Sequence, residues 1–512
     1  MTGHGDEQAA GPADGPVADG TATSPPDVGP RVTRRRHAPR PVAGRTSAIV
    51  SVLVVAVGIG LVSLAAPAPS PAPAPPVGDG VSVAPVDATT SSLFCTTGAG
   101  VDAGAGATAT VVLTNTTAAP VAGVASTVGT TGATPVATRV AVPARGSVAV
   151  TPPAGSPVTA TATTFTFAGG GVTGTAVVSG PKGWSTAPCA TQVSPQWDFA
   201  GGATATGLLD LSLYNPTAAA VVADVTFLTG NGTVIQPQAY QGISLPPGQL
   251  AVEGLGAYVQ GQSVVATLVQ ATSGALVATE LDQMAFPTGS GLALLAGTPG
   301  AATTWRFAQT TVVPGGTVAL DVANPGLAPL TAQVSAVVPG ATVVPQTVTV
   351  PGRAVGTVAV SSVAGWPLGS PYALTVSASG PVVVGRTVTA PAGAASPQGG
   401  ISGATTSLAT SWLVVPPGVP GRPVVAGGAL DNLAITDPGS SPVQVTVTRL
   451  GGGSPAVTVQ VPAGGLSLLG PARVGGLHPL VVSATGPVGI LADEAPTGAP
   501  GVVATAGFPL AG

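Results

Sequence analysis

The chain has 512 residues, a formal net charge of −4 and 7% charged residues, against about 25% in an ordinary globular domain. This charge gives no electrostatic reason to expect nucleic-acid binding. Its 74 glycines and 54 prolines approach the content of low-complexity chains. A mean hydropathy of +0.51 is nevertheless too high for a largely disordered protein, so we expect several domains with apolar cores.

The N-terminal part predicts a membrane anchor. Residues 1–47 are rich in Gly, Pro, Asp and Ala without apolar periodicity, which predicts a disordered cytoplasmic tail. Residues 48–66 carry no charge and no Pro and would span roughly 28 Å as a helix, which predicts one transmembrane helix that anchors the chain in the lipid bilayer. Six Arg precede this segment, so we expect the C-terminal part to be extracellular. A cleaved signal peptide is the alternative, although its apolar segment and the region before it are usually shorter.

A Pro/Ala-rich stalk follows the predicted helix, at residues 67–92. Its first part, residues 67–80, alternates Pro with Ala, and this pattern favours an extended polyproline II conformation. Such a stalk would hold the ectodomain away from the bilayer.

The remainder of the chain repeats. In each copy, aliphatic residues stand two and four positions before an Asn or Asp, which is the period of a strand with one buried face. These turn residues, 100, 109 and 113 positions apart, are Asn115, Asn215, Asn324 and Asp437. We predict an all-β ectodomain of tandem immunoglobulin-like β-sandwich repeats, with a β-propeller of two blades per repeat as the alternative. The predicted repeats are residues 93–192, 193–301, 302–404 and 405–512.

An aromatic residue opens each repeat: Phe94, Trp197, Trp305 and Trp412. Aromatic side chains contribute much of the apolar area in protein cores, so we predict an inter-sheet core position for each of them. An exposed platform for a ligand is the alternative.

The chain has two cysteines, Cys95 and Cys189, which bracket the first repeat. Both follow the predicted anchor, on the side of the membrane where disulfides persist. We therefore predict a disulfide between them, with two free thiols as the alternative. Two Cys without nearby His make only half of a zinc site, and we expect no metal and no cofactor.

Side chains with catalytic potential are scarce. His478 is the only histidine after the predicted helix, and its Gly/Pro-rich surroundings indicate a turn residue. Glu280 and Asp282 would share one face of a strand, and Asp493 stands next to Glu494. Either pair could act as acid and base, but charges on an edge strand or at the end of a strand, which discourage aggregation, are the simpler interpretation.

The layout resembles a family of actinobacterial single-pass surface proteins of unknown function. The shared features are the Arg-rich tail, one membrane helix, the Pro/Ala stalk and weak repeats with the turn Asn215-Pro216-Thr217. The first and fourth repeats depart from this turn, with Thr116 after Asn115 and Gly439 after Pro438. The resemblance implies no established activity and no functional residues.

These observations predict a membrane-anchored structural or interaction protein of the cell envelope, without catalytic activity. Its expected partner is an envelope protein or a glycan. A non-catalytic accessory subunit of an envelope glycan assembly or export system is the alternative. An enzyme that uses Glu280, Asp282 or His478 is the least favoured hypothesis, because so few groups could act as acid, base or nucleophile.

Overall fold

A computed structural model describes most of the chain after residue 80. The described residues are 81–97, 108–130, 134–152, 160–180, 182–286, 289–389, 398–420, 422–424, 430, 432–493 and 504–510. They belong to one unit, Ala74–Gly512. The predicted tail, the predicted helix at residues 48–66 and the Pro/Ala part of the stalk lie outside the described residues. Within the described part, the helices are all too short or too polar to span a bilayer.

The first repeat forms two antiparallel sheets. Its strands are β1 (Ser91–Thr96), β2 (Thr108–Asn115), β3 (Val121–Gly129), β4 (Val136–Val142), β5 (Gly146–Val150), β6 (Thr161–Phe167), β7 (Val172–Gly180) and β8 (Gly183–Pro188). One sheet has the order β1-β6-β3-β4 and the other β5-β2-β7-β8. Leu93 and Phe165 from one sheet and Leu113 from the other meet in a shared core, as the period-two pattern predicts.

The second repeat has the same two layers. Its elements are β9 (Gln196–Gly202), β10 (Leu208–Tyr214), β11 (Val221–Thr229), β12 (Val234–Ile235), η1 (Gln238–Tyr240), β13 (Ile243–Leu245), β14 (Leu250–Gly254), η2 (Leu255–Ala257), β15 (Val265–Ser273), β16 (Val277–Phe286) and β17 (Gly289–Ala296). The sheets are β12-β11-β15-β9, with β13 also on β11, and β14-β10-β16-β17. Trp197, Leu211 and Phe227 lie in the core between them.

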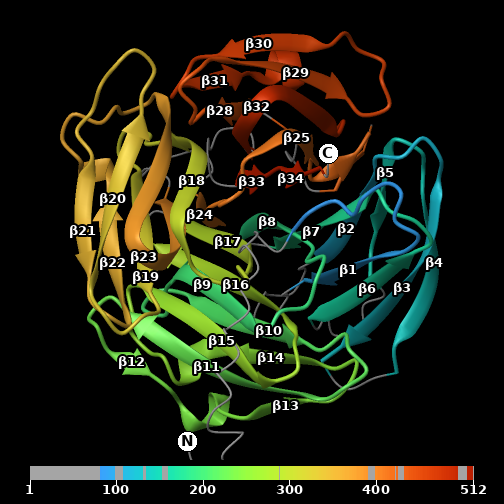
Figure 1. Ribbon diagram of the computed structural model, residues 1–512. Helices are drawn as coiled ribbons and strands as arrows, with labels where there is room; N and C mark the ends of the chain where they lie inside the picture. Colours follow the sequence, from blue (N-terminus) through green and yellow to red (C-terminus); the bar gives the residue numbers. More distant parts are fainter. Residues whose placement is uncertain are drawn as a thin grey trace, which may run out of the picture. The chain divides into compact units, whose positions relative to one another are not determined.

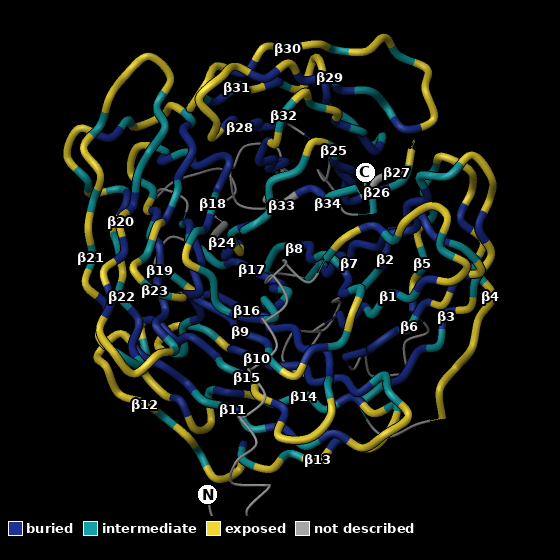
Figure 2. Tube along the Cα trace, viewed as in Figure 1, coloured by how far each residue is buried: buried dark blue, intermediate teal, exposed yellow. Residues whose placement is uncertain are grey.

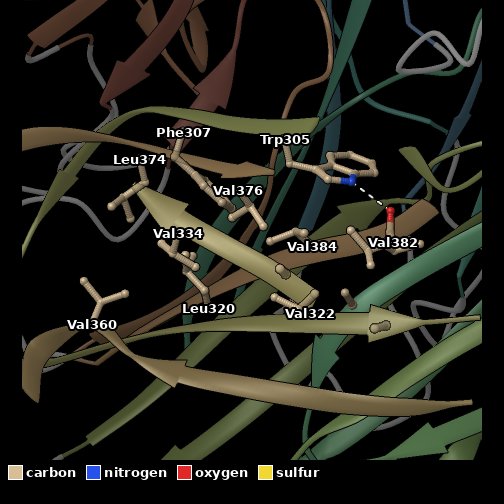
Figure 3. Close-up of a cluster of buried hydrophobic side chains, with 14 of the residues drawn as sticks. Trp305, Phe307, Leu320, Val322, Val334, Val360, Leu374, Val376, Val382 and Val384 are labelled. Carbon is tan, nitrogen blue, oxygen red and sulfur yellow. Dashed lines mark hydrogen bonds between the residues drawn. The ribbon is translucent and has the colours of Figure 1, made fainter. Parts of the chain in front are cut away.

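The third repeat uses one long strand in both sheets. Its elements are β18 (Ala302–Thr311), β19 (Thr317–Asn324), β20 (Leu330–Val337), β21 (Gln346–Val350), β22 (Ala354–Ala359), η3 (Val360–Ser362), β23 (Pro371–Thr389) and β24 (Gln398–Gly403). The first half of β23 pairs with β18 and β20, and its second half pairs with β19 and β24. Figure 3 shows the resulting core, in which Trp305, Leu320 and Val376 face one another.

The fourth repeat is built in the same way around β32. Its elements are β25 (Ala409–Val414), β26 (Gly418–Val419), β27 (Arg422–Pro423), β28 (Asn432–Thr436), β29 (Val443–Arg449), β30 (Val457–Val461), β31 (Leu466–Leu469), α2 (Pro471–Val474), β32 (Leu480–Asp493), β33 (Ala504–Ala506) and β34 (Phe508–Pro509). One sheet has the order β30-β29-β32-β25-β34, and β31, β28, β32 and β33 form the other. Trp412, Ile435 and Val482 pack in the core.

Neighbouring repeats contact one another in sequence order. Leu281, Leu292 and Leu294 of the second repeat complete the core of the first. β17 of the second repeat pairs in parallel with β24 of the third. Ala308 of the third repeat belongs to one apolar cluster with Leu491 of the fourth.

The fourth repeat also contacts the first, which closes the order. Val83, upstream of β1, forms a parallel bridge with Leu510, and its N–H donates to the carbonyl of Pro509 at 3.3 Å. An apolar cluster joins Trp184 of the first repeat to Phe508 of the fourth. The repeats therefore follow one another in propeller-like order (Figure 1), with one two-sheet unit per repeat and not the two blades that the alternative assumed.

Burial follows this arrangement (Figure 2). Most residues of β8 and β17 are buried, whereas the outer strands β4, β21 and β30 carry alternating or continuous exposed residues. The all-β class predicted from the sequence is confirmed.

Candidate functional site

The recurring turn residue is buried in each repeat, and in the first three repeats its side chain connects two backbone segments. The Oδ1 atom of Asn215 accepts hydrogen bonds from the backbone N–H and the hydroxyl of Thr217, at 2.9 and 2.7 Å. Its Nδ2 atom donates to the carbonyls of Ala219 and Leu245, both at 2.8 Å. One side chain thus joins the β10–β11 turn to the β13–β14 turn. We name this arrangement the clasp.

Two other repeats have the same clasp. The Nδ2 atom of Asn115 donates to the carbonyls of Ala119 and Pro143, at 2.8 and 3.2 Å. The equivalent bonds of Asn324 reach Ala328 and Pro351, at 2.9 and 3.0 Å. The recurrence of Asn at these positions is therefore explained by backbone hydrogen bonds, which a buried polar group requires.

The aromatic residue that opens each repeat is a second recurring feature. The indole N–H groups of Trp197, Trp305 and Trp412 donate to the carbonyls of Leu276, Val382 and Val488, at 2.7, 2.8 and 3.1 Å. All three rings are at most 1% exposed, so the prediction of core positions is confirmed for them.

Phe94 differs from the three tryptophans. It is only partly buried and packs against the core of the second repeat and the cluster around Tyr214, while its neighbours Leu93 and Cys95 point into the core of the first. The core position predicted for Phe94 is wrong, because its place in the strand puts it on the opposite face of β1.

Cys95 and Cys189 form a disulfide in the structure. Both are 1% exposed and belong to the core of the first repeat. The bond links β1 to the residue that follows β8, and the two cysteines are 94 positions apart in the sequence. Its place at both ends of one repeat fits a structural cross-link.

Glu280 and Asp282 do not lie on an edge strand. β16 is paired on both sides, by β10 and β17. Glu280 lies opposite Leu211 and Asp282 lies opposite Leu209, two residues of the core of the second repeat. The interpretation of Glu280 and Asp282 as edge-strand or strand-end charges is wrong, because both stand inside β16, which is paired on both sides and buried on both faces.

Burial governs the chemistry of these carboxyl groups. It raises the pKa of Glu280 to about 7, and burial together with the charge of Glu280 raises the pKa of Asp282 well above its ordinary value. Burial also raises the pKa of Asp198, on β9, to about 7. One oxygen of each of these three groups has no hydrogen-bond partner. All three are internal groups, and neither Glu280 nor Asp282 lines the two hollows described below.

The other candidate side chains lie elsewhere. His478 is half-buried in the bend between α2 and β32, in the fourth repeat. The backbone of Asp493 pairs with Asn432 at the end of β32, while its side chain and all of Glu494 lie outside the described residues. The structure therefore does not bring His478 together with Glu280 and Asp282, which are enclosed in a different repeat. Within the described ranges, no group of three or more His, Cys, Asp or Glu could hold a metal ion.

An open depression lies on the outer face of the first repeat. It has a volume of about 650 Å³, and its walls come from β3, β4 and β6. Ala122 and Val124 on β3 lie opposite Ala141 and Arg139 on β4, so all four share the face that points away from the core. The small side chains leave the face hollow, and Arg139 is the single charged residue among those that line it.

A smaller cavity lies where several repeats meet. It has a volume of about 90 Å³, room for about three waters. Thr186, Leu294 and Ser402, from three different repeats, contribute to its lining, and so does Gly507 of the fourth. None of the residues that line it is charged.

Sequence reasoning missed several buried polar residues. Asp198, Asp210, Asp321 and Arg386 are at most 5% exposed. Thr357 and Thr387 donate to the two carboxylate oxygens of Asp321, at 2.8 and 3.1 Å. A charged residue inside a predicted strand was the one feature of the sequence that could have indicated them. The pairing of the strands is needed to show whether such a residue lies on a buried face.

The fold and the recurring buried residues define a class: an all-β protein of four two-sheet repeats whose recurrent polar groups serve the backbone. The chain belongs to a family of unknown function (DUF5719), whose profile matches residues 151–471. This match covers the second and third repeats completely and the adjoining parts of the first and fourth.

Other comparisons add little. No curated protein matches the chain. A solved structure of a tetra-tandem repeat in the extending region of a large adhesion protein shares 14% sequence identity and covers 82% of this chain and 99% of that chain. Its TM-score is 0.12, and a likeness of this size carries no argument about fold or function.

Proposed function

We propose that the protein is a non-catalytic interaction protein of the cell envelope, anchored in the membrane through residues 48–66. In this proposal the N-terminus is cytoplasmic, and immunoglobulin-like repeats are extracellular. The partner is a protein with an apolar surface, and nucleic acid is not a ligand. The anchor is tested by deleting residues 48–66, which should move the protein from the membrane fraction to the soluble fraction.

The depression on the first repeat carries this proposal. Pockets that bind small molecules are concave, mostly apolar and about 300–1,000 Å³ in volume. The depression, of about 650 Å³, therefore has room for apolar side chains of a protein partner. Ala122, Ala141 and Ala168 make its floor apolar, and Val124 is 44% exposed at its side. Its lining holds no carboxylate, His, Cys or Lys, so it offers contact area without an acid or a base.

The chemistry of the lining favours a protein over a glycan. Sugar-binding sites commonly stack sugar rings on exposed aromatic side chains, whereas the one aromatic residue in this lining, Phe167, is 1% exposed. Arg139 is exposed beside the apolar floor and can pair with a carboxylate of the partner at the rim. β4 pairs only with β3 among the described residues, so its outer edge also offers backbone groups to an added strand.

The test uses the full chain, oxidised, in a pull-down from an envelope extract. Ala141→Glu places a charge on the floor of the depression and should abolish retention of the partner. Thr349→Glu is the matched control, because Thr349 is the equivalent exposed position on β21 of the third repeat. Retention of the same partner by both variants, or by neither, would remove the depression from the proposal.

A further inference from the structure

The fourth repeat has Asp437 where the other three have a clasp Asn, and the backbone around it is the same. The N–H of Gly439 donates to Oδ1 of Asp437 at 2.7 Å, as the N–H of Gly326 donates to Asn324 at 2.9 Å. The N–H of Gly464 donates to the carbonyl of Gly439 at 2.9 Å, and the N–H of Arg353 donates to Gly326 at 2.8 Å. The two turns of the clasp therefore face each other in both repeats.

The difference lies at the second side-chain atom. In the third repeat this atom is the amide nitrogen of Asn324, whose hydrogens point at the carbonyls of Ala328, Val350 and Pro351, at 2.9, 3.3 and 3.0 Å. In the fourth repeat it is the Oδ2 atom of Asp437, which has no hydrogen-bond partner although the residue is only 2% exposed.

The carbonyls that correspond to the three acceptors are those of Ser441, Val461 and Pro462. An amide can donate to such carbonyls, but a carboxylate oxygen has no hydrogen to share with them. In the third repeat three such carbonyls surround the amide nitrogen, so the equivalent carbonyls of the fourth repeat would leave Oδ2 among oxygens. These oxygens repel one another unless a cation or a proton lies between them. Adjacent oxygen ligands of a hard cation, each about 2.4 Å from the ion, stand at separations close to those of the amide hydrogen bonds.

We propose that Asp437 and the carbonyls of Ser441, Val461 and Pro462 form a calcium site. Calcium takes six to eight oxygen ligands, carboxylate and carbonyl among them, in flexible geometry. The β28–β29 turn over the clasp is exposed at Gly439, Ser440 and Ser441, so water completes the coordination from that side. Magnesium demands a stricter octahedron and keeps its water, and it binds this site more weakly.

The bound ion links the β28–β29 turn to the β30–β31 turn, as the Asn side-chain amide links the equivalent turns of the other repeats. A single carboxylate with neutral carbonyls gives a weak site, with a dissociation constant of about 10⁻⁴–10⁻³ M, the range of extracellular calcium modules. The fourth repeat is therefore stable at extracellular calcium concentrations and loosens where calcium is scarce.

The experiment measures thermal unfolding of the full chain in millimolar calcium, in millimolar magnesium and in EDTA. Calcium should raise the unfolding temperature of the native chain by about 1–4 °C over EDTA, and magnesium by less. Asp437→Asn restores the amide, so its unfolding temperature in EDTA should exceed that of the native chain and should not respond to calcium. Isothermal titration should find one calcium ion per native chain and none for the variant.

Asn324→Asp is the matched test in the third repeat. It converts an amide clasp into the carboxylate form, so this variant should gain a second calcium ion and a larger calcium-dependent shift. An equal calcium shift in the native chain and in Asp437→Asn would overturn the proposal, because the ion would then bind elsewhere. A native chain that does not respond to calcium, beside a stabilised Asp437→Asn, would overturn it as well.

Discussion

The second and third repeats place opposite charges at the same buried position. Glu280 on β16 lies opposite Leu211, and Arg386 on β23 lies opposite Leu320. Leu211 and Leu320 both stand four residues before the clasp Asn of their repeat. Both charged side chains therefore lie at the same point of the two-sheet frame.

The side chains of Arg386 and Glu280 have different hydrogen-bond partners. The Nε atom of Arg386 donates to Ser402 at 3.1 Å, another nitrogen donates to Gln309 and Thr310, and the guanidinium lies 5.2 Å from the ring centre of Phe307. Glu280 has an oxygen without a partner and a pKa raised by burial to about 7. Arginine cannot lose its charge, so a buried guanidinium needs hydrogen-bond acceptors around it. A buried carboxyl group can bind a proton and become neutral instead.

The largest expected effect comes from removing the bonded charge. Arg386→Met should lower the free energy of unfolding by about 3–5 kcal/mol, because buried polar partners such as the carbonyl of Gln309 lose their donor. Urea unfolding followed by tryptophan fluorescence measures this change. Thr347→Met, on the exposed face of β21, is the control and should change little. A loss under about 1 kcal/mol for Arg386→Met would mean that the core can do without the guanidinium.

The second prediction concerns pH. The pKa of Glu280 is raised from 4.5 to about 7 in the folded chain, so the folded state holds a proton that the unfolded state has lost between these values. The free energy of unfolding therefore has its full contribution from Glu280 below about pH 4.5, and it falls as the pH rises from there to about 7. The loss amounts to roughly 3 kcal/mol.

Glu280→Gln removes this titration. The variant should be more stable than the native chain at pH 8, and the difference should shrink toward pH 5, as urea unfolding at both pH values would show. Asp282 and Asp198 titrate in the same direction and remain in both proteins. A stability difference that is independent of pH would show that Glu280 does not hold the proton.

The third prediction tests what the two repeats share. Asn215→Ala and Asn324→Ala should each lower the free energy of unfolding by about 2–3 kcal/mol, because each leaves buried carbonyls without a donor. Asn231→Ala is the control, since its side chain is exposed and bonds only within its own turn. Unequal losses of unfolding free energy for the Asn215 and Asn324 variants would show that the clasps do not stabilise their repeats equally.

The smallest expected effect lies in the turn that the clasp holds. Gly248 has φ +71° in the second repeat, and Arg353 has φ +54° at the equivalent position of the third. Gly248→Arg should lower the free energy of unfolding by about 1–2 kcal/mol, because a side chain is strained at this φ even though no atom lies within 4 Å of the added Cβ. Thermal unfolding measures this change. An unaltered unfolding temperature would show that this turn accommodates side chains in both repeats.

Local patterns in the sequence were enough to predict the strands, their turns and the repeat. Period-two apolar positions, such as Leu211 and Leu213 before Asn215, depend only on local geometry, because alternate residues of a strand face the same side. The tryptophans in the core follow from the same local pattern and from their large apolar area. The class of fold and the core positions of three tryptophans could thus be predicted from the sequence.

Which strands are internal, and what each buried polar atom contacts, depends on how the strands are ordered in the folded chain. Glu280 is inside because β10 and β17 flank its strand, and strand order is a non-local property that no local pattern reports. Phe94 turns toward the second repeat because a shift by one residue exchanges the two faces of a strand. The sequence predicts only that Asp437 is a turn residue. Its Oδ2 atom is buried without a hydrogen-bond donor because the β28–β29 and β30–β31 turns, which are distant in the sequence, pack together over it.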